Sequence, residues 1–227
     1  MKTLEICVDS LASARNAIAG GADRLELCAA LVAGGLTPYV HLLEQIRSES
    51  DIPVHCLMRP RPGDFLYEAE EIDMMAKQMP VLKAAGADGF VIGCLTKDGD
   101  LDEDAMKKLI DAADGAGLTL HRCIDVSRDP IETYRTAGKL GIDTVLTSGA
   151  ASNCILGLPT IGRLLELRDE IDGPEVLIGA GVKADVESAM AVRRDGVPMG
   201  LPGLDEWHIP TTSREAVAAA RSVLYDL

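Results

Sequence analysis

The chain has 227 residues, which fits one domain of α/β-barrel size, and 47% of them are hydrophobic but only 3% aromatic, so we expect a large, aliphatic core. The formal net charge of −14 argues against nucleic acid and against an anionic membrane surface as partners. No basic-then-apolar signal segment opens the chain and no apolar run approaches the roughly 18 residues of a membrane span, so we expect a cytoplasmic protein whose six cysteines are reduced.

Strand and helix patterns alternate along the whole chain. Short buried strands are predicted at residues 4–7, 23–28, 52–58, 88–92, 118–122, 143–146 and 176–178, with a weak eighth strand near residues 206–209. Helical patterns follow them at about residues 11–20, 37–46, 70–85, 102–113, after residue 129, through residues 161–167, and at about residues 184–192 and 213–225.

A short motif repeats where predicted helices lead into strands. Gly-Ala-Asp or Gly-Ile-Asp stands at residues 21–23, 86–88 and 141–143, and its glycine suits the left-handed end of a helix. The repeat supports a series of strand–helix units with no linker between them. This predicts a TIM (β/α)₈ barrel in one domain over residues 1–227, with an atypical eighth strand. A doubly wound open sheet is the alternative, but no Gly-x-Gly-x-x-Gly follows the first strand.

Charged and titratable side chains gather where the predicted strands end. In such barrels the functional face lies at the carboxyl ends of the strands and in the loops after them. Alternation along the strands turns one set inward: Glu5, Glu26, Arg59 and His121. Because buried charges must pair or bind something, this set is either a catalytic site, in which a glutamate and His121 move protons, or a paired polar plug that closes the barrel.

Other polar residues follow the same strands and are candidates for substrate binding. They are Arg61, Asp64, Arg122, Asp125, Ser148 and Gly149. Arg59 and Arg61 together suit an anionic group of a substrate. A Gly-Ala-Gly sequence at residues 179–181 offers backbone N–H groups to a phosphate, although a tight turn needs the same glycines.

Two cysteines hold equivalent places in a repeated Leu-Glu-x-Cys strand sequence, Cys7 and Cys28. Neighbouring parallel strands lie about 4.8 Å apart, so two thiolates in these places suit a soft ion such as Cu(I). Packing as small apolar groups is the alternative for this pair. The remaining cysteines, which show no zinc-like spacing, are expected to fill core space: Cys56, Cys94, Cys123 and Cys154.

Several long motifs resemble the copper homeostasis protein CutC family. They are Glu-Ile-Cys-Val-Asp-Ser (5–10), Gly-Gly-Ala-Asp-Arg-Leu-Glu-Leu-Cys (20–28), Gly-Gly-Leu-Thr-Pro (34–38), Met-Arg-Pro-Arg-Pro-Gly-Asp-Phe-Leu-Tyr (58–67), His-Arg (121–122) with Asp125, and Val-Leu-Thr-Ser-Gly (145–149). The resemblance runs from residue 1 to about residue 182. It implies a TIM-like barrel, a cytoplasmic location and a role in copper handling, with Cys7 and Cys28 as Cu(I) ligands.

The sequence departs from this family at a few positions. It has Cys123 and Ile124 where His-Arg-Ala-Phe-Asp is usual, and an alanine between two glycines where three glycines are usual. Two hypotheses follow. The first is a copper-binding protein of copper homeostasis that holds Cu(I) and forms a homo-oligomer. The alternative is a TIM-barrel enzyme of unassigned reaction that acts on a small polar or anionic substrate at the mouth of the barrel.

Overall fold

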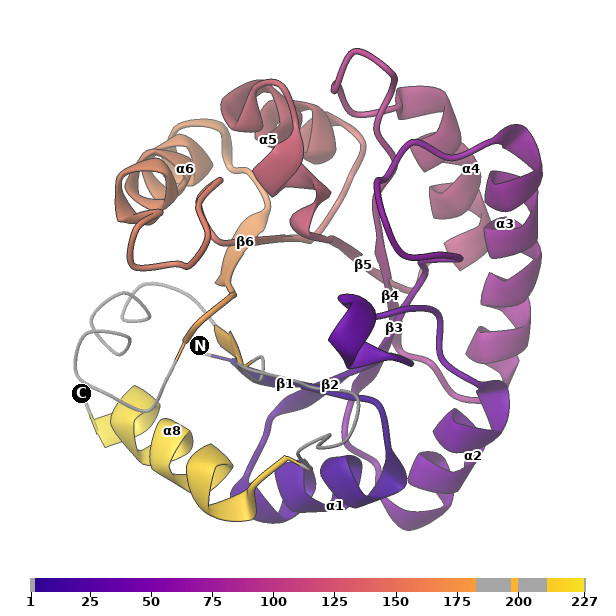
Figure 1. Cartoon of the computed structure of the whole chain (residues 1–227), viewed down its shortest axis with the longest axis vertical. Coiled ribbons are helices and arrows are strands. Elements are labelled where there is room, and N and C mark those ends of the chain that lie inside the picture. The colour runs from indigo at the N-terminus through magenta and orange to yellow at the C-terminus, as the bar shows by residue number, and fades with distance from the viewer. Residues whose placement is uncertain (1–2, 183–196, 200–211, 227) are drawn as a thin grey trace.

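The strands form one parallel sheet in the computed structural model, which describes residues 3–182, 197–199 and 212–226. They hydrogen-bond in the order β7-β6-β5-β4-β3-β2-β1-β8. Their bounds are β1 (Leu4–Val8), β2 (Arg24–Leu27), β3 (Val54–Leu57), β4 (Gly89–Ile92), β5 (Gly117–Leu120), β6 (Thr144–Thr147), β7 (Glu175–Ile178) and β8 (Val197–Met199). The sheet curls, so its carboxyl edge opens on one side of the molecule (Figure 1). The sequential order contradicts the doubly wound alternative, in which the strand order reverses.

Helices ring the outside of the curled sheet (Figure 1). They are α1 (Leu11–Gly20), α2 (Val40–Glu49), α3 (Ala69–Ala84), α4 (Glu103–Ala113), α5 (Pro130–Lys139), α6 (Leu158–Ile171) and α8 (Arg214–Asp226), with 3₁₀ helices η1 (Leu31–Ala33) and η2 (Arg122–Val126). Local chemistry explains several starts. Ser10 caps α1 by accepting from the Ser13 N–H, and Asp129 caps α5 just before Pro130. The alternation of strands and helices predicted from the sequence is thus confirmed for the described residues.

The two faces of the sheet bury different side chains. Leu4, Ile6 and their counterparts on the other strands pack outward against the helices in one large apolar core. The inner face carries a small apolar cluster of Cys28, Leu57 and Val91 together with polar groups. Side chains alternate along a strand. A strand with polar residues at every second position therefore has a polar inner face beside its apolar outer face.

The repeated aspartate fastens the amino ends of the strands. Asp23 accepts a hydrogen bond from the Leu4 N–H (2.8 Å), and Asp88 accepts one from the Val54 N–H (2.7 Å). Asp143 does the same for the Leu118 N–H (2.7 Å). The glycine two residues before each aspartate has a positive φ, of 92°, 108° and 79° in chain order. The Gly-x-Asp repeat therefore joins neighbouring strands at the amino edge of the sheet. The candidate site residues lie at the opposite, carboxyl edge.

Two predicted strands differ from the structure. The fifth strand ends at Leu120, and residues 122–126 form η2, because the His121 side chain caps this turn instead of continuing the strand. The last described strand is β8 at Val197–Met199, whereas the predicted eighth strand at 206–209 lies outside the described residues. Pro198 stands inside β8, and a proline argues against a strand when only the sequence is known. The predicted helix at 184–192 also lies outside the described residues.

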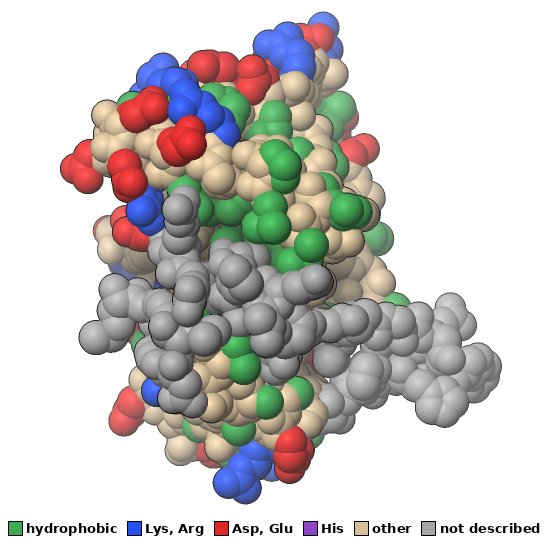
Figure 2. Space-filling view, turned by 90° about the vertical axis from the view of Figure 1, so that its left-hand side faces the viewer, with side chains coloured by type: hydrophobic (Ala, Val, Ile, Leu, Met, Phe, Trp, Pro, Cys, Tyr) green, Lys and Arg blue, Asp and Glu red, His purple; other side chains and the backbone are tan. Residues whose placement is uncertain are grey.

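The outer surface mixes both signs of charge. Figure 2 shows acidic and basic side chains side by side over the face that it displays, with apolar groups between them. None of the helices in the described ranges is long and apolar enough to cross a membrane. A groove of about 550 Å³ lies between α2 and α3, lined by Tyr39, Met74 and Val81 among others. This groove lies on the outer wall, and its lining residue Thr37 is hydrogen-bonded to Arg59 at the end of β3.

Candidate functional site

Glu5 on β1 forms an ion pair with Arg24 on β2 inside the sheet. The Glu5 side chain is fully buried, and the Arg24 side chain is 17% exposed. The pairing follows from the register, which sets these two residues side by side on neighbouring strands. Burial raises the pKa of Glu5, while the Arg24 guanidinium opposes that rise. The cation that pairs with Glu5 is therefore Arg24, which the expected inward set did not include.

Glu26 lies beside both site thiols. The Cys28 S–H donates to Glu26 Oε1 (3.5 Å), and hydrogen bonding to Glu26 also helps raise the pKa of Cys7. Burial, followed by the charge of Glu5, raises the pKa of Glu26 to about 8. Burial and the charge of Glu26 raise the pKa of both thiols well above its ordinary value. At neutral pH the Glu26 carboxyl group and the two thiols are therefore protonated.

The register of β1 and β2 corrects one expectation about the thiols. Cys7 is paired with Glu26, and Cys28 stands two residues further along β2. The two cysteines are therefore not at equivalent heights, since neighbouring strands of a curled sheet are staggered. They remain near enough that the charge of Cys7 acts on the pKa of Cys28. Gly35 covers Cys28 from above: a Cβ there would lie 3.5 Å from the Cys28 sulfur and 2.8 Å from Leu57.

His55 on β3 fills space that two glycines leave open. A Cβ on Gly89 would lie 2.5 Å from His55 Nε2, and one on Gly117 would lie 3.4 Å from His55 Cε1. Burial, and then the charge of Arg24, lowers the pKa of His55 to about 4. His55 is therefore a neutral ring at physiological pH. It belongs to the inner polar group, as its alternation with Arg59 predicts.

Arg59 follows β3 and turns its guanidinium into the loops above the sheet. Its Nη1 donates to the carbonyls of Ala33 (3.1 Å) and Gly35 (3.0 Å), and its Nη2 donates to that of Gly63 (2.8 Å). The group also lies over the ring of Phe65, at 5.2 Å from the ring centroid. Arg59 is only 7% exposed. All three partners are neutral carbonyls, so within the described residues no carboxylate compensates its charge.

His121 ends β5, and its hydrogen bond fixes its tautomer. The Cys123 N–H donates to His121 Nδ1 (3.1 Å), so the proton of the neutral ring is on Nε2. Burial, and then the charge of Arg59, lowers the pKa of His121 to about 3. The ring packs against Phe65 with 4.6 Å between centroids. His121 therefore presents an N–H donor to the interior at neutral pH.

Arg61 and Asp64 belong to the β3–α3 loop and bind within it. Arg61 Nε donates to Glu71 Oε1 (2.7 Å), Arg61 Nη1 donates to Asp64 Oδ1 (3.0 Å), and Arg61 lies over the ring of Tyr67 (5.2 Å to the centroid). These contacts hold the loop onto the start of α3. The anion-binding role that the sequence suggested for Arg61 stays a prediction, and its guanidinium already has carboxylate partners.

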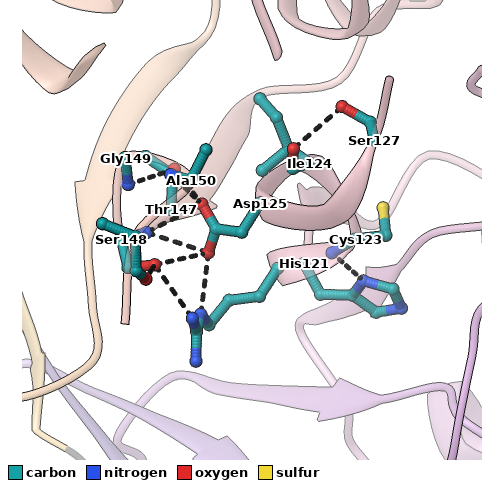
Figure 3. Close-up of polar contacts among 11 residues, drawn as sticks. His121, Cys123, Ile124, Asp125, Ser127, Thr147, Ser148, Gly149 and Ala150 are labelled. Atoms are coloured by element: carbon teal, nitrogen blue, oxygen red, sulfur yellow. Dashed lines mark hydrogen bonds and ion pairs between the residues drawn. The ribbon is translucent and has the colours of Figure 1, made fainter. Parts of the chain in front are cut away.

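Asp125 joins η2 to the end of β6 (Figure 3). It accepts hydrogen bonds from Thr147 Oγ1 (2.5 Å), from the Ser148 N–H (3.0 Å) and Ser148 Oγ (2.9 Å), and from the Ala150 N–H (3.0 Å). Arg122 Nε pairs with the same carboxylate (2.8 Å). The Gly149 N–H is bonded to Thr147 Oγ1 (2.8 Å). Four candidate binding residues, Arg122, Asp125, Ser148 and Gly149, thus cross-link two loops, and His121 points away from them (Figure 3).

Backbone contacts also occupy the turn after β7. The Gly179 N–H donates to the Thr147 carbonyl (2.9 Å), and the Ala180 carbonyl accepts from the Cys154 N–H (2.9 Å). The Gly179 N–H is therefore committed to the sheet and does not offer itself to a phosphate. Ala180 has a φ of 65°, which a glycine adopts more easily.

Several polar atoms of the interior have no hydrogen-bond partner among the described residues. They are Glu5 Oε1, Glu26 Oε2, His55 Nδ1, Arg59 Nε, Tyr67 OH, Thr119 Oγ1 and His121 Nε2. Buried polar groups in folded proteins are almost always paired, so a group of unpaired ones marks a place where something else binds. Residues from β1, β2, β3 and β5 contribute, which places this feature inside the curled sheet.

The donors around Cys7 and Cys28 suit a soft monovalent ion. Two thiols are the ligands that Cu(I) prefers, and the protonated Glu26 adds no negative charge. In the described ranges no group of three or more His, Cys, Asp or Glu side chains has metal-binding spacing.

Sequence reasoning missed Arg24 and Phe65. Arg24 had a usable signal, because it stands two residues before Glu26 and therefore faces inward with it. His55 was predicted to face inward with Arg59, but no role was assigned to it. Phe65 had no signal, since its contact with Arg59 and His121 depends on the path of an irregular loop.

Comparison with known sequences finds one family. A sequence model described as the CutC family matches residues 2–199. A CutC family protein from Porphyromonas gingivalis is 37% identical over 243 aligned residues, which cover 97% of this chain and 97% of that one. A human protein named copper homeostasis protein cutC homolog is 44% identical over 163 residues, 72% of this chain and 60% of that one.

Comparison with solved structures gives the same result for the fold. The crystal structure of a CutC protein from Streptococcus agalactiae has a TM-score of 0.80 and 25% identity, and the match covers 87% of this chain and 98% of that one. Monomers of phosphoribosylanthranilate isomerase from Thermotoga maritima match all of both chains with a TM-score of 0.62 at 12% identity. That second likeness concerns the fold alone.

Proposed function

The chain belongs to the CutC family, and from that premise we propose that it takes part in copper homeostasis in the cytoplasm by binding Cu(I) at Cys7 and Cys28. A human relative carries the name copper homeostasis protein, which supports the role. We also infer that the sheet closes between β7 and β8 into a TIM (β/α)₈ barrel, since these two edge strands lie close together. A closed barrel would keep the thiols of β1 and β2 out of bulk water.

The observation that carries the copper proposal is the meeting of two thiols at one buried carboxyl group. Cys28 donates to Glu26, and Cys7 is paired with Glu26 in the register of the strands. The other four cysteines belong to the large apolar core, whereas Cys28 belongs to the small inner cluster and Cys7 faces Glu26 across the strands. Binding of Cu(I) requires both thiols to release their protons. The free energy of Cu(I) binding must therefore exceed the cost of forming two thiolates in a buried place.

An anaerobic Cu(I) titration against a competing chelator tests this proposal. The wild-type chain is expected to take up Cu(I) in a near-stoichiometric amount, and the double variant Cys7→Ser, Cys28→Ser is expected to lose this binding. The matched control is the double variant Cys56→Ala, Cys94→Ala, which removes two buried thiols of the outer core and should bind as the wild type does. Unchanged binding in the serine variant, with its fold verified by circular dichroism, would contradict the proposal.

A second candidate is an enzyme that acts on a small polar or anionic substrate inside the sheet. The unpartnered buried atoms favour it, because they offer a ligand both donors and acceptors. Glu26, with a pKa of about 8, holds a proton near neutral pH and is able to transfer it. Native mass spectrometry of protein purified from cells tests this candidate. A co-purifying organic molecule supports it, and copper as the sole adduct contradicts it.

A further inference from the structure

Arg59 and His121 form a pair of buried donors on the inner side of the carboxyl edge. Both lie against one ring, since Phe65 packs on His121 at 4.6 Å between centroids and on Arg59 at 5.2 Å. Arg59 is 7% exposed and His121 is 4% exposed. Phe65 therefore packs against both polar groups, and both are shielded from water.

Each of the two groups keeps one donor without an acceptor. Arg59 Nη1 and Nη2 are bound to carbonyls, but Arg59 Nε has no partner among the described residues. The His121 proton stands on Nε2, because Nδ1 accepts from Cys123, and Nε2 likewise has no partner in that part of the chain. Thr119 precedes His121 by two residues, so its hydroxyl shares the inner face, and it too is unpartnered. Three donor groups, Arg59 Nε, His121 Nε2 and the Thr119 hydroxyl, thus have no acceptor among the described residues.

The net charge around Arg59 and His121 indicates what charge a bound ligand should carry. Arg59 brings one positive charge, and its three bound partners are neutral carbonyls. His121 is neutral, and the negative charge of Glu5 is already matched by Arg24. A buried guanidinium without a counter-charge is costly, so a single negative charge is the best complement. Two parallel oxygens of a carboxylate also match two separate N–H donors.

We propose that the interior of the sheet, at the carboxyl ends of β3 and β5, binds a small monoanionic carboxylate, which accepts hydrogen bonds from Arg59 Nε and His121 Nε2. The Thr119 hydroxyl is the third group available to it. This site is distinct from the thiols, and it names the ligand class for the second candidate function, on which it rests. In it His121 donates a hydrogen bond and does not accept a proton.

Calorimetric titration of the metal-free protein with small probes tests the proposal. Acetate, glycolate and pyruvate are the carboxylates, and acetamide, glycolamide and pyruvamide are their neutral counterparts of equal size. At least one carboxylate is expected to bind about 10-fold or more tightly than its amide, because a charged hydrogen bond is worth about 1.5–3 kcal/mol.

Two substitutions of His121 separate its donor from its structural bond. His121→Asn keeps an oxygen that accepts from Cys123 but has no donor at the Nε2 position, so it should weaken carboxylate binding about 10- to 100-fold. His121→Gln places an amide N–H near the Nε2 position and should restore most of the affinity. The ¹⁵N spectrum of the His121 ring should show the Nε2–H form and a downfield shift of that proton when the carboxylate binds.

The outcomes distinguish this proposal from the functions on which it builds. Equal binding of carboxylate and amide overturns the proposed ligand class while leaving a small-molecule site in place. Binding of no probe overturns the proposal, and co-purification then decides the second candidate by itself. Equal carboxylate affinity in wild type, His121→Asn and His121→Gln also overturns the proposal. The copper titration does not depend on any of these results.

Discussion

Asp125 and Glu26 are two buried carboxyl groups near the same edge of the sheet, and their surroundings differ. Asp125 receives hydrogen bonds from two hydroxyls, two backbone N–H groups and a guanidinium. Glu26 meets thiols and leaves Oε2 without a partner among the described residues. Burial by itself does not separate a structural carboxylate from a functional one. The number and strength of its hydrogen-bond donors separate the two kinds. Strong donors hold a carboxylate in a structural role, whereas weak donors leave the carboxyl group able to bind or to exchange a proton.

Asp125→Ala is expected to have the largest effect on stability. It removes the acceptor that joins η2 to β6 and leaves the Arg122 guanidinium and several N–H and O–H groups without their partner. The free energy of unfolding should fall by about 3–5 kcal/mol. Urea denaturation followed by circular dichroism measures it. A loss below about 1 kcal/mol would show that the network around Asp125 is replaceable by water.

Arg24→Met comes next. It leaves Glu5 buried without its counter-charge, and the free energy of unfolding should fall by about 2–3 kcal/mol. The double variant Arg24→Met, Glu5→Gln should recover much of this loss, because no unpaired charge remains. The same denaturation experiment on both single variants and the double variant gives the coupling energy. Strictly additive losses would contradict a direct pairing of these two side chains.

Acid should destabilise the protein through its two buried histidines. Burial lowers the pKa of His55 to about 4 and that of His121 to about 3, whereas unfolded histidine titrates near 6.5. The unfolded chain thus takes up protons first, so the stabilisation by these neutral rings is complete above pH 6.5 and is lost as pH falls toward 4. Each histidine contributes up to about 1.4 kcal/mol per pH unit. His55→Gln should show a shallower loss between pH 6.5 and 4 in urea denaturation; an unchanged slope would contradict the assignment.

Glu26→Gln is expected to have the smallest effect in acid, below about 1 kcal/mol under pH 4.5, because Gln then replaces a carboxyl group that is protonated in both the folded and the unfolded chain. The folded pKa of about 8 lies above the unfolded value of 4.5. The contribution of Glu26 is therefore complete below pH 4.5 and is lost as pH rises to 8. Relative to the wild type, the variant should gain stability from pH 4.5 to pH 8, by up to about 1.4 kcal/mol per pH unit. Parallel pH profiles in urea denaturation would contradict the raised pKa.

The strands and helices were predictable because their signals are local. The Leu-Glu-x-Cys pattern places Glu5 and Cys7 on the inner face, and the structure buries Leu4 and Ile6 in the outer core as the alternation requires. The end of β5 was not predictable from alternation, since the His121 side chain bonds its own turn. The strand β8 was not predictable either, because it contains Pro198. Its pairing with β1 in the folded structure makes it a strand.

The partners within the site were harder to predict than its members. Which residue of β2 faces Cys7 depends on the stagger of the sheet, and this is a global property that no single strand reveals. The donors to Asp125 include backbone groups of Ser148 and Ala150, which carry no mark in the sequence. The sequence therefore indicates which polar residues meet at the carboxyl edge. The structure shows which of them are hydrogen-bonded within the described residues and which keep an unpartnered polar atom.

The aspartate ties at the amino ends divide the sheet into modules. Asp23 links the starts of β1 and β2, Asp88 those of β3 and β4, and Asp143 those of β5 and β6. Glu26 and both site thiols lie within the first module, whereas Arg59 and His121 follow strands of the second and third. Because β2 also pairs with β3, and β4 with β5, the modules form one continuous sheet. The sheet therefore fixes the distance between the thiols of the first module and the donors that follow the second and third.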